Sequence, residues 1–270
     1  MAKGISIHVG LNHVDPAHYE GWDGALSACV NDARDMQALA KKQGFAERTL
    51  LLNEKATVAA VSGAITAAAK KLAKGDVLLL TYSGHGGQVK DTNGDEKDKG
   101  RKDETWVLFD RQFVDDELYA LWGKFKSGVR IVVLSDSCHS GTVTRDIPEF
   151  LEGGPRRRAM PSVVGEKVEK AHKKLYRSVQ DATKGTENVK VNASVLLISG
   201  CMDNQFSMDG EKNGAFTGRL KKVWANGKFQ GDYRKFRDVI VSGMPSSQTP
   251  NYSFVGVPHA AFEKQKPFSV

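Results

Sequence analysis

Two apolar runs that end in small and chemically reactive residues constrain the fold of this chain most strongly. Residues 129–141 read VRIVVLSDSCHSG, and residues 76–82 read DVLLLTY directly before SGHGG. An unbroken apolar run bounded by small polar residues is typical of a strand buried on both faces of a parallel sheet. Because ligands of open α/β sheets bind at the carboxyl ends of the strands, we expect His85 and Cys138 to meet at one functional edge.

A thiol beside an imidazole provides a nucleophile and a base, the two groups that cysteine-dependent nucleophilic catalysis requires. The thiolate is the attacking species, and His85 can take up the proton of Cys138 and later protonate a leaving amine. A lone cysteine is more often a small buried hydrophobe, but here both residues follow predicted strands among small residues. His139 is a rival base. Adjacent side chains at a strand end diverge, which favours His85.

Seven short motifs lie in order along nearly the whole chain. They are ACVNDA (28–33), YSGHG (82–86), DETWVLFD (103–110), VDDEL (114–118), DSCHSGT (136–142), SGCMDNQFSMD (199–209) and GAFT (214–217). Each is short, but seven in this order resemble the metacaspases, the caspase-like cysteine peptidases of plants, fungi, protists and bacteria. The resemblance implies one caspase-like peptidase domain over residues 1–270.

Strands and helices alternate, which predicts a parallel sheet with right-handed crossovers. The resemblance implies a caspase-like three-layer α/β sandwich with a mostly parallel, six-stranded sheet flanked by helices. Strands are expected at 5–9, 49–52, 76–82, 106–110, 129–135, 195–199 and 252–257, the one at 106–110 being small. Helices are expected at 25–43, 57–72, 114–126, 214–225 and 232–241. A basic, flexible insertion at about 145–192 contains too few apolar residues for another core layer, with an exposed helix at 166–179.

Length and composition indicate the kind of domain, the cellular compartment and the kinds of partner to expect. With 270 residues, 40% of them hydrophobic and 26% charged, the chain can bury the core of one large α/β domain. It has no apolar run long enough for a membrane span and no signal-peptide pattern. Its three cysteines fit no zinc spacing, and its +7 charge gathers in residues 156–190 rather than in a nucleic-acid-binding module. We expect a cytoplasmic monomer that binds neither nucleic acid nor membrane.

The resemblance assigns the parts of a peptide-cleaving site. It implies a dyad of His85 and Cys138, with the amides of Gly86 and Cys138 as an oxyanion hole. It also implies a pocket for the residue before the cut bond, formed by Cys29, Asp32, Ser83 and Asp136, with Asp203 as a further acidic member. A carboxylate near a thiolate would oppose its ionisation, so a binding role suits Asp136 better than a catalytic one. Paired carboxylates match the forked donors of arginine.

Many metacaspases require calcium, and the resemblance implies a regulatory Ca²⁺ site outside the catalytic crevice. The matching positions are Asp103, Asp115 and Asp116, and Asp146 follows only with a shift of one residue. Clustered carboxylates suit this hard cation, although Asp115 and Asp116 also fit a helix start. Residues 91–104 begin like an EF-hand loop, but Glu96 and Lys102 stand where glycine and glutamate are needed, so an EF-hand is excluded.

The expected function is a calcium-stimulated, self-processing cysteine endopeptidase that cleaves proteins or peptides after Arg or Lys. Residues 156–158 and 173–177 are the expected self-cleavage sites, because they are basic and tethered beside the pocket. One alternative is another peptidase of the caspase clan, of the clostripain-like or gingipain-like kind. A second alternative is a non-catalytic caspase-like binding scaffold.

Overall fold

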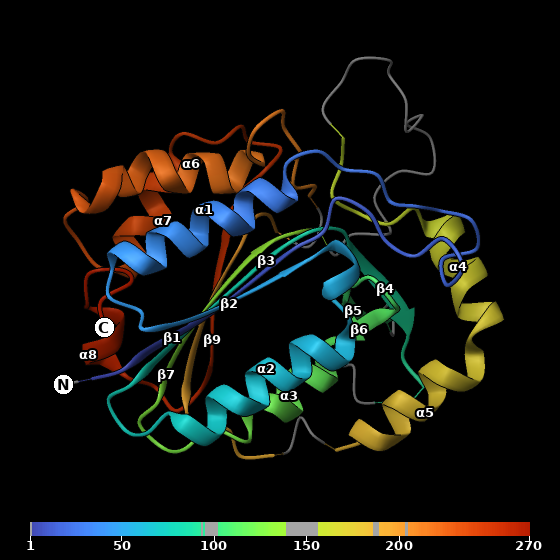
Figure 1. Cartoon of the computed structure of the whole chain (residues 1–270), viewed down its shortest axis with the longest axis horizontal. Helices are drawn as coiled ribbons and strands as arrows, with labels where there is room; N and C mark the ends of the chain where they lie inside the picture. The colour runs from blue at the N-terminus through green and yellow to red at the C-terminus, as the bar shows by residue number, and fades with distance from the viewer. Residues whose placement is uncertain (1, 93, 95–101, 139–155, 186–188, 203–204) are drawn as a thin grey trace.

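The central element is a six-stranded sheet in the order β2-β1-β3-β7-β8-β9 (Figure 1). The computed structural model describes residues 2–92, 94, 102–138, 156–185, 189–202 and 205–270. The strands are β1 (Gly4–Gly10), β2 (Glu47–Leu52), β3 (Val77–Ser83), β7 (Arg130–Asp136), β8 (Ser194–Ser199) and β9 (Asn251–Gly256). All neighbours pair in parallel except β8 and β9. The predicted mostly parallel, six-stranded sheet is confirmed.

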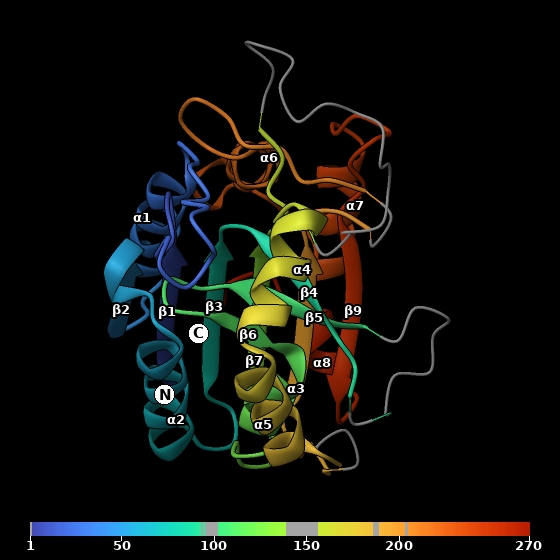
Figure 2. The same ribbon diagram turned by 90° about the vertical axis from the view of Figure 1, so that its right-hand side faces the viewer.

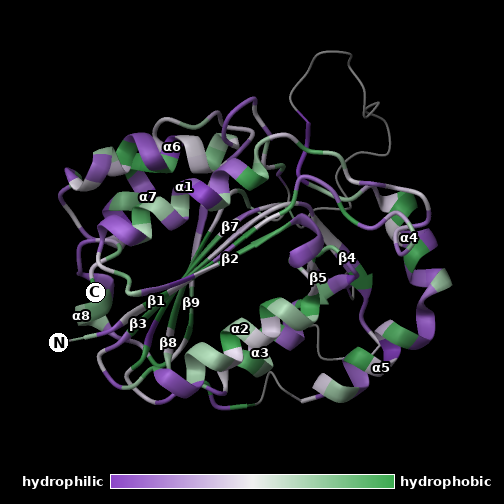
Figure 3. Cartoon of the chain, viewed as in Figure 1, coloured by the Kyte–Doolittle hydropathy of each residue, from purple (hydrophilic) through white to green (hydrophobic). Residues whose placement is uncertain are grey.

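Helices cover both faces of the sheet, which makes the three-layer sandwich that the sequence predicts (Figure 1). On one face lie α1 (Cys29–Lys42), α6 (Ala215–Trp224) and α7 (Tyr233–Val241), and on the other α2 (Val58–Lys71) and α3 (Asp115–Trp122). The buried strand β3 alternates between two cores: Leu78 and Leu80 join one apolar cluster, and Val77 and Leu79 the other. Figure 3 shows the apolar strands between helices of mixed polarity.

A second, antiparallel sheet stands beside the carboxyl ends of the central strands and was not predicted. It consists of β4 (Gly86–Lys90), β5 (Lys102–Val107) and β6 (Gln112–Val114). The small strand expected at 106–110 therefore begins earlier, within a charged stretch that carries little strand signal. Figure 2 shows α4 (Ser162–Ala171) and α5 (Lys173–Thr183) in front of this sheet, and α4 packs on β4.

Short elements complete the described chain. They are η1 (Asn53–Lys55), η3 (Ala225–Gly227) and α8 (Ala260–Glu263). The helix expected at 166–179 is instead the pair α4 and α5, whose Val168, Tyr176 and Gln180 are buried. Two parts of the predicted insertion, residues 145–155 and 186–188, lie outside the described residues. No helix in the described ranges combines the length and the apolar character needed to cross a membrane.

A buried histidine in the central sheet makes stability depend on pH. His8 of β1 is fully buried, and its Nδ1 lies 2.9 Å from the hydroxyl of Thr81 on β3. Burial lowers the pKa of His8 to about 3, and the positive charge of Arg48 acts in the same direction. The fold therefore favours the neutral ring, a contribution that is complete above the unfolded pKa of about 6.5 and is lost as pH falls towards 3.

We expect the free energy of unfolding to fall by up to about 1.4 kcal/mol per pH unit for this one group below pH 6. In His8→Asn, which keeps a polar atom near Thr81 but does not titrate, that part of the slope should be absent. Urea unfolding at pH 7, 6 and 5 measures it. His13→Asn is the matched control, because the His13 side chain is 40% exposed. Equal slopes in wild type and His8→Asn would contradict the assignment.

Candidate active site

His85 and Cys138 leave neighbouring strand ends. The parallel pairing of β3 with β7 sets Ser83 opposite Asp136, so His85 and Cys138 each follow two residues later. Both side chains are buried. The sheet thus brings the imidazole and the thiol to the edge where the two apolar runs end, as the sequence predicts.

The ring of His85 is oriented by the loop that precedes α1. Its Nε2 lies 3.0 Å from the carbonyl oxygen of Gly24, and its ring centroid lies 4.8 Å from that of Trp22. A carbonyl only accepts, so Nε2 carries the hydrogen and the buried Nδ1 is free to accept a proton. Burial lowers the pKa of His85 to about 4, against the raising effect of the Gly24 carbonyl. The imidazole is therefore neutral at pH 7, the form that can accept a proton.

The chain's own residues 156–160 lie across this edge in extended form. Arg157 makes an antiparallel bridge with Met208, the amide of Arg158 donates to the Ser207 carbonyl at 2.9 Å, and the Asp209 amide donates to the Arg156 carbonyl at 2.7 Å. On the far side of Arg158 the partner changes to Gly86, which accepts from the amide of Met160 at 2.8 Å. The segment is bound as a peptide substrate would be, by strand addition.

The carbonyl oxygen of Arg158 accepts two amide hydrogen bonds. The amides of Gly86 and Cys138 both lie 3.0 Å from it. These distances are those of donors that stabilise a tetrahedral oxyanion. Only glycine fits at position 86, since a Cβ there would lie 1.8 Å from the carbonyl oxygen of Cys138. The two amides named from the sequence therefore converge on one carbonyl group, that of the peptide bond between Arg158 and Ala159.

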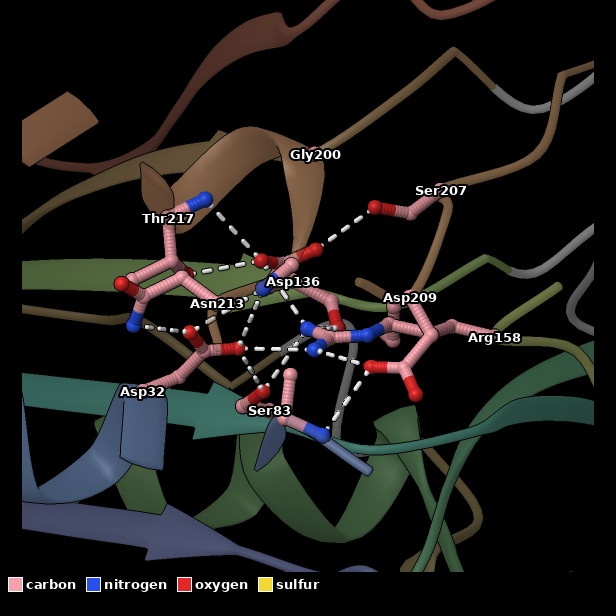
Figure 4. A network of polar contacts seen from close by, with 12 residues as sticks. Asp32, Ser83, Asp136, Arg158, Gly200, Ser207, Asp209, Asn213 and Thr217 are labelled. Atoms are coloured by element: carbon pink, nitrogen blue, oxygen red, sulfur yellow. Dashed lines mark hydrogen bonds and ion pairs between the residues drawn. The ribbon is translucent and has the colours of Figure 1, made fainter. Parts of the chain in front are cut away.

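The side chain of Arg158 fills an acidic pocket and is fully buried (Figure 4). Its guanidinium nitrogens lie 2.7 Å from Asp32, 2.9 Å from Asp136 and 2.9 Å from Asp209. It also donates to the hydroxyl of Ser83 at 2.8 Å. Burial disfavours the charged guanidinium, but the attraction of these carboxylates exceeds that cost and raises the pKa of Arg158.

Each carboxylate is fixed by donors from other elements. Asp32 of α1 accepts from the side chain of Asn213 at 2.9 Å and from the amide of Gly214. Asp136 accepts from the hydroxyl of Ser207 at 2.6 Å, and from the amide and hydroxyl of Thr217 at 3.0 and 2.7 Å.

Asp209 accepts from the amides of Ser27 and Ala28 at 2.7 and 3.3 Å, just before α1 begins. Gly214 closes the pocket, because a Cβ there would lie 2.5 Å from the guanidinium carbon of Arg158. The pocket is therefore prearranged for one planar cation.

The structure brings together most of the residues predicted for substrate binding. Asp32, Ser83 and Asp136 contact Arg158 directly. Cys29 is buried at the start of α1, and burial raises the pKa of its thiol to about 12, against the lowering effect of Arg158. Asp203 lies outside the described residues.

Asp209 is the acidic member that sequence reasoning missed. It ends the motif from which Asp203 was chosen, and its position five residues before the start of GAFT was a weak signal. Ser207, Asn213 and Thr217, which hold the carboxylates, were also missed. Their role depends on contacts between segments that are distant in sequence.

The residues predicted to bind calcium lie apart from this pocket. Asp103 of β5 and Asp116 of α3 are buried, and both accept hydrogen bonds from α5, Asp103 from Gln180 and Asp116 from Thr183. The nearby Asp91 has a buried carboxylate oxygen with no hydrogen-bond partner among the described residues. In the described part of the chain no three acidic, histidine or cysteine side chains converge as a metal site, and Asp146 lies outside that part.

Two solved structures resemble this chain in fold, and one of them also in sequence. The crystal structure of protein GSU0716 from Geobacter sulfurreducens matches with a TM-score of 0.90 and covers 99% of both chains. The two sequences are 54% identical. The crystal structure of caspase-1 from Spodoptera frugiperda, at 11% identity, covers 94% of this chain and 86% of its own with a TM-score of 0.52, and supports the fold alone.

Curated relatives include metacaspase-1 of Mycosarcoma maydis, 32% identical over 81% of this chain and 60% of that protein. Metacaspase-1 of Schizosaccharomyces pombe is 30% identical over 82% of this chain and 58% of that protein. This chain therefore spans at most 60% of the length of these two relatives. The family model described as caspase domain matches residues 14–261. The chain belongs to the caspase-domain family of cysteine-type peptidases, and metacaspases are among its relatives.

Proposed function

We propose that this chain is a cysteine endopeptidase that cleaves peptide bonds after arginine or lysine, with Cys138 as nucleophile and His85 as base. The observation that carries the proposal is the position of Arg158. Its carbonyl oxygen meets the amides of Gly86 and Cys138, while its guanidinium meets three buried carboxylates. A peptide bound in this way presents the carbonyl group of its basic residue to Cys138.

The proposed reaction uses these groups. In the structure Cys138 Sγ contacts the backbone of Ser207, and His85 Nδ1 makes no hydrogen bond among the described residues. Neutral His85 accepts the thiol proton at Nδ1, and Cys138 Sγ attacks the carbonyl carbon. The two amides stabilise the oxyanion, and His85 passes the proton to the leaving amine as the C–N bond breaks. Water then hydrolyses the thioester, which releases the arginyl carboxylate and restores the thiol.

Two rival functions remain distinguishable by experiment. A clostripain-like or gingipain-like peptidase would share the dyad and the basic preference, whereas a non-catalytic scaffold would bind peptides without turnover. Covalent labelling of Cys138 by an arginyl electrophile supports a peptidase of either kind. We also propose a monomer in the reducing cytoplasm, where the buried free thiols of Cys29, Cys138 and Cys201 are stable.

The first test is specificity. Wild type should cleave arginyl fluorogenic peptides, lysyl ones more slowly, and aspartyl ones not at all, because three carboxylates repel a substrate carboxylate. Asp136→Asn or Asp209→Asn should raise the KM for arginyl peptides about tenfold or more, since one charge-assisted hydrogen bond is worth about 1.5–3 kcal/mol.

Asp238→Asn is the matched control, because that side chain is 57% exposed and remote in the fold. Alkylation of Cys138 by iodoacetamide should be unchanged in the pocket variants, which separates binding from reactivity. Cys138→Ala and His85→Ala should each lower turnover by on the order of 10³ or more. Cleavage after aspartate, or full activity of Cys138→Ala, would overturn the proposal.

The second test concerns self-cleavage, which we propose at the bond between Arg158 and Ala159. Residues 173–177, the other basic candidate, lie within α5 and would have to unwind to bind in extended form. Active enzyme should therefore yield a new amino terminus at Ala159, and Cys138→Ala should yield none. Arg158→Gln should prevent the cut, whereas Arg157→Gln should permit it.

Peptide mass spectrometry of freshly purified protein identifies the cut. Fragments that begin after residues 173–177 in active enzyme but not in Cys138→Ala would place the site elsewhere. Identical fragments in both proteins would indicate a contaminating protease.

The third test concerns calcium, which we propose binds at Asp103, Asp115 and Asp116. The hydroxyl of Thr183, which contacts Asp116, is a suitable further ligand, because calcium takes six to eight oxygen atoms. When bound, the ion would supply positive charge that holds these carboxylates together. Calcium should raise arginyl turnover and protect residues 91–110 from trypsin.

Calorimetry on uncleaved Cys138→Ala gives a readout that does not require activity. Asp116→Asn should weaken calcium binding about tenfold or more, as expected when a ligand charge is removed, whereas Asp181→Asn, at an exposed site on α5, should not. An absence of binding heat together with equal turnover in calcium and in chelator would exclude this site.

A further inference from the structure

The residues after the Arg158–Ala159 bond are anchored independently of Arg158. The amide of Met160 donates to the carbonyl of Gly86 at 2.8 Å, and the Met160 side chain is only 4% exposed. Its Cε packs beside Gly87 and Gly165, the latter in α4. Because α4 packs on β4, Met160 is held from both sides.

Cleavage of this bond breaks none of these contacts. Ala159 lies between Arg158, whose carbonyl accepts from the amides of Gly86 and Cys138, and Met160, whose amide donates to Gly86. After self-cleavage, the new α-amine of Ala159 is thus one residue from a buried anchor and next to the groups that act on the thioester.

We propose that the Ala159 amine of the processed enzyme accepts acyl groups from Cys138, so that the enzyme ligates arginyl peptides to its own Ala159 as well as hydrolysing them. The inference rests on the proposed function, since it requires self-cleavage after Arg158 and an acyl-enzyme. The acyl donors are peptides with arginine before the cut bond, and the acceptor is this single amine.

The ligation step balances without any further reactant. The lone pair of the neutral amine attacks the thioester carbonyl held by the amides of Gly86 and Cys138. The C–N bond forms, the C–S bond breaks, and Cys138 leaves as the thiolate. His85 takes the amine proton and returns it to the thiolate. An anchored nucleophile has an effective concentration that can reach about 10⁵ M, which allows it to compete with water.

Processed wild-type enzyme is mixed with an acetylated peptidyl-arginyl-aminomethylcoumarin and quenched in acid at intervals. The intact mass of the fragment that begins at Ala159 should rise by the mass of the acyl peptide while substrate lasts, and fall back once it is consumed. Tandem mass spectrometry should place the new bond on the Ala159 nitrogen. The adduct per coumarin released should be several-fold higher at pH 8.5 than at pH 6.5, because an α-amine has an ordinary pKa of about 7.7–8.0.

A variant that loosens the anchor provides the matched comparison. Met160→Gly should lower the adduct-to-coumarin ratio about tenfold, whereas Met160→Leu, which keeps an apolar side chain, should preserve it. Coumarin release and a cut after Arg158 without any adduct at pH 8.5 would overturn the inference and leave the proposed function intact. Acylation of lysines instead of Ala159 would also overturn it. Absence of coumarin release would instead count against the proposed function.

Discussion

The ion pairs between Arg158 and three carboxylates are the constraint on which the site depends. One positive charge faces Asp32, Asp136 and Asp209 in a region from which water is excluded. Removing one member of a buried ion pair typically costs about 3–5 kcal/mol, because the remaining charge stays buried. Burial raises the pKa of Asp32 against the lowering effect of Arg158, and without a cation the three buried carboxylates would repel one another. The pocket therefore requires a cation, from its own chain or from a substrate.

Much of the site followed from the sequence because it lies on regular elements. The apolar runs that became β3 and β7 define two neighbouring strand ends, and residues at fixed distances after them must share one edge. That reasoning places His85 and Cys138 without any knowledge of loops, whereas the pocket residues Ser83 and Asp136 were assigned through the metacaspase resemblance. It also accounts for the sheet and its two helical layers, since the period of two in β3 separates the two cores.

The remaining parts depend on contacts that no local pattern encodes. Three consecutive arginines at 156–158 are equivalent by composition, and only the pairing of Arg157 with Met208 decides that Arg158 points into the pocket. Asp209 lines the pocket because the two residues before α1, Ser27 and Ala28, donate their amides to its carboxylate. The small sheet β4–β6 was missed for a related reason: charged residues 102–104 become a strand through pairing, not through propensity.

The pocket that favours basic substrates is also filled by Arg158 of the uncut chain. The same three carboxylates therefore bind a substrate and hold the residue that blocks it. Any external arginine must displace Arg158, which is bound by three ion pairs and two backbone hydrogen bonds to its carbonyl. While the chain is intact, Arg158 is bound in the pocket and is also linked to the anchored Met160. To displace Arg158, a substrate must therefore break the contacts of both residues. Cutting the bond after Arg158 uncouples them, so that the arginine can leave while Met160 stays. Self-cleavage therefore opens only the pocket that binds the residue before the cut bond, and the part of the site occupied by Met160 stays filled.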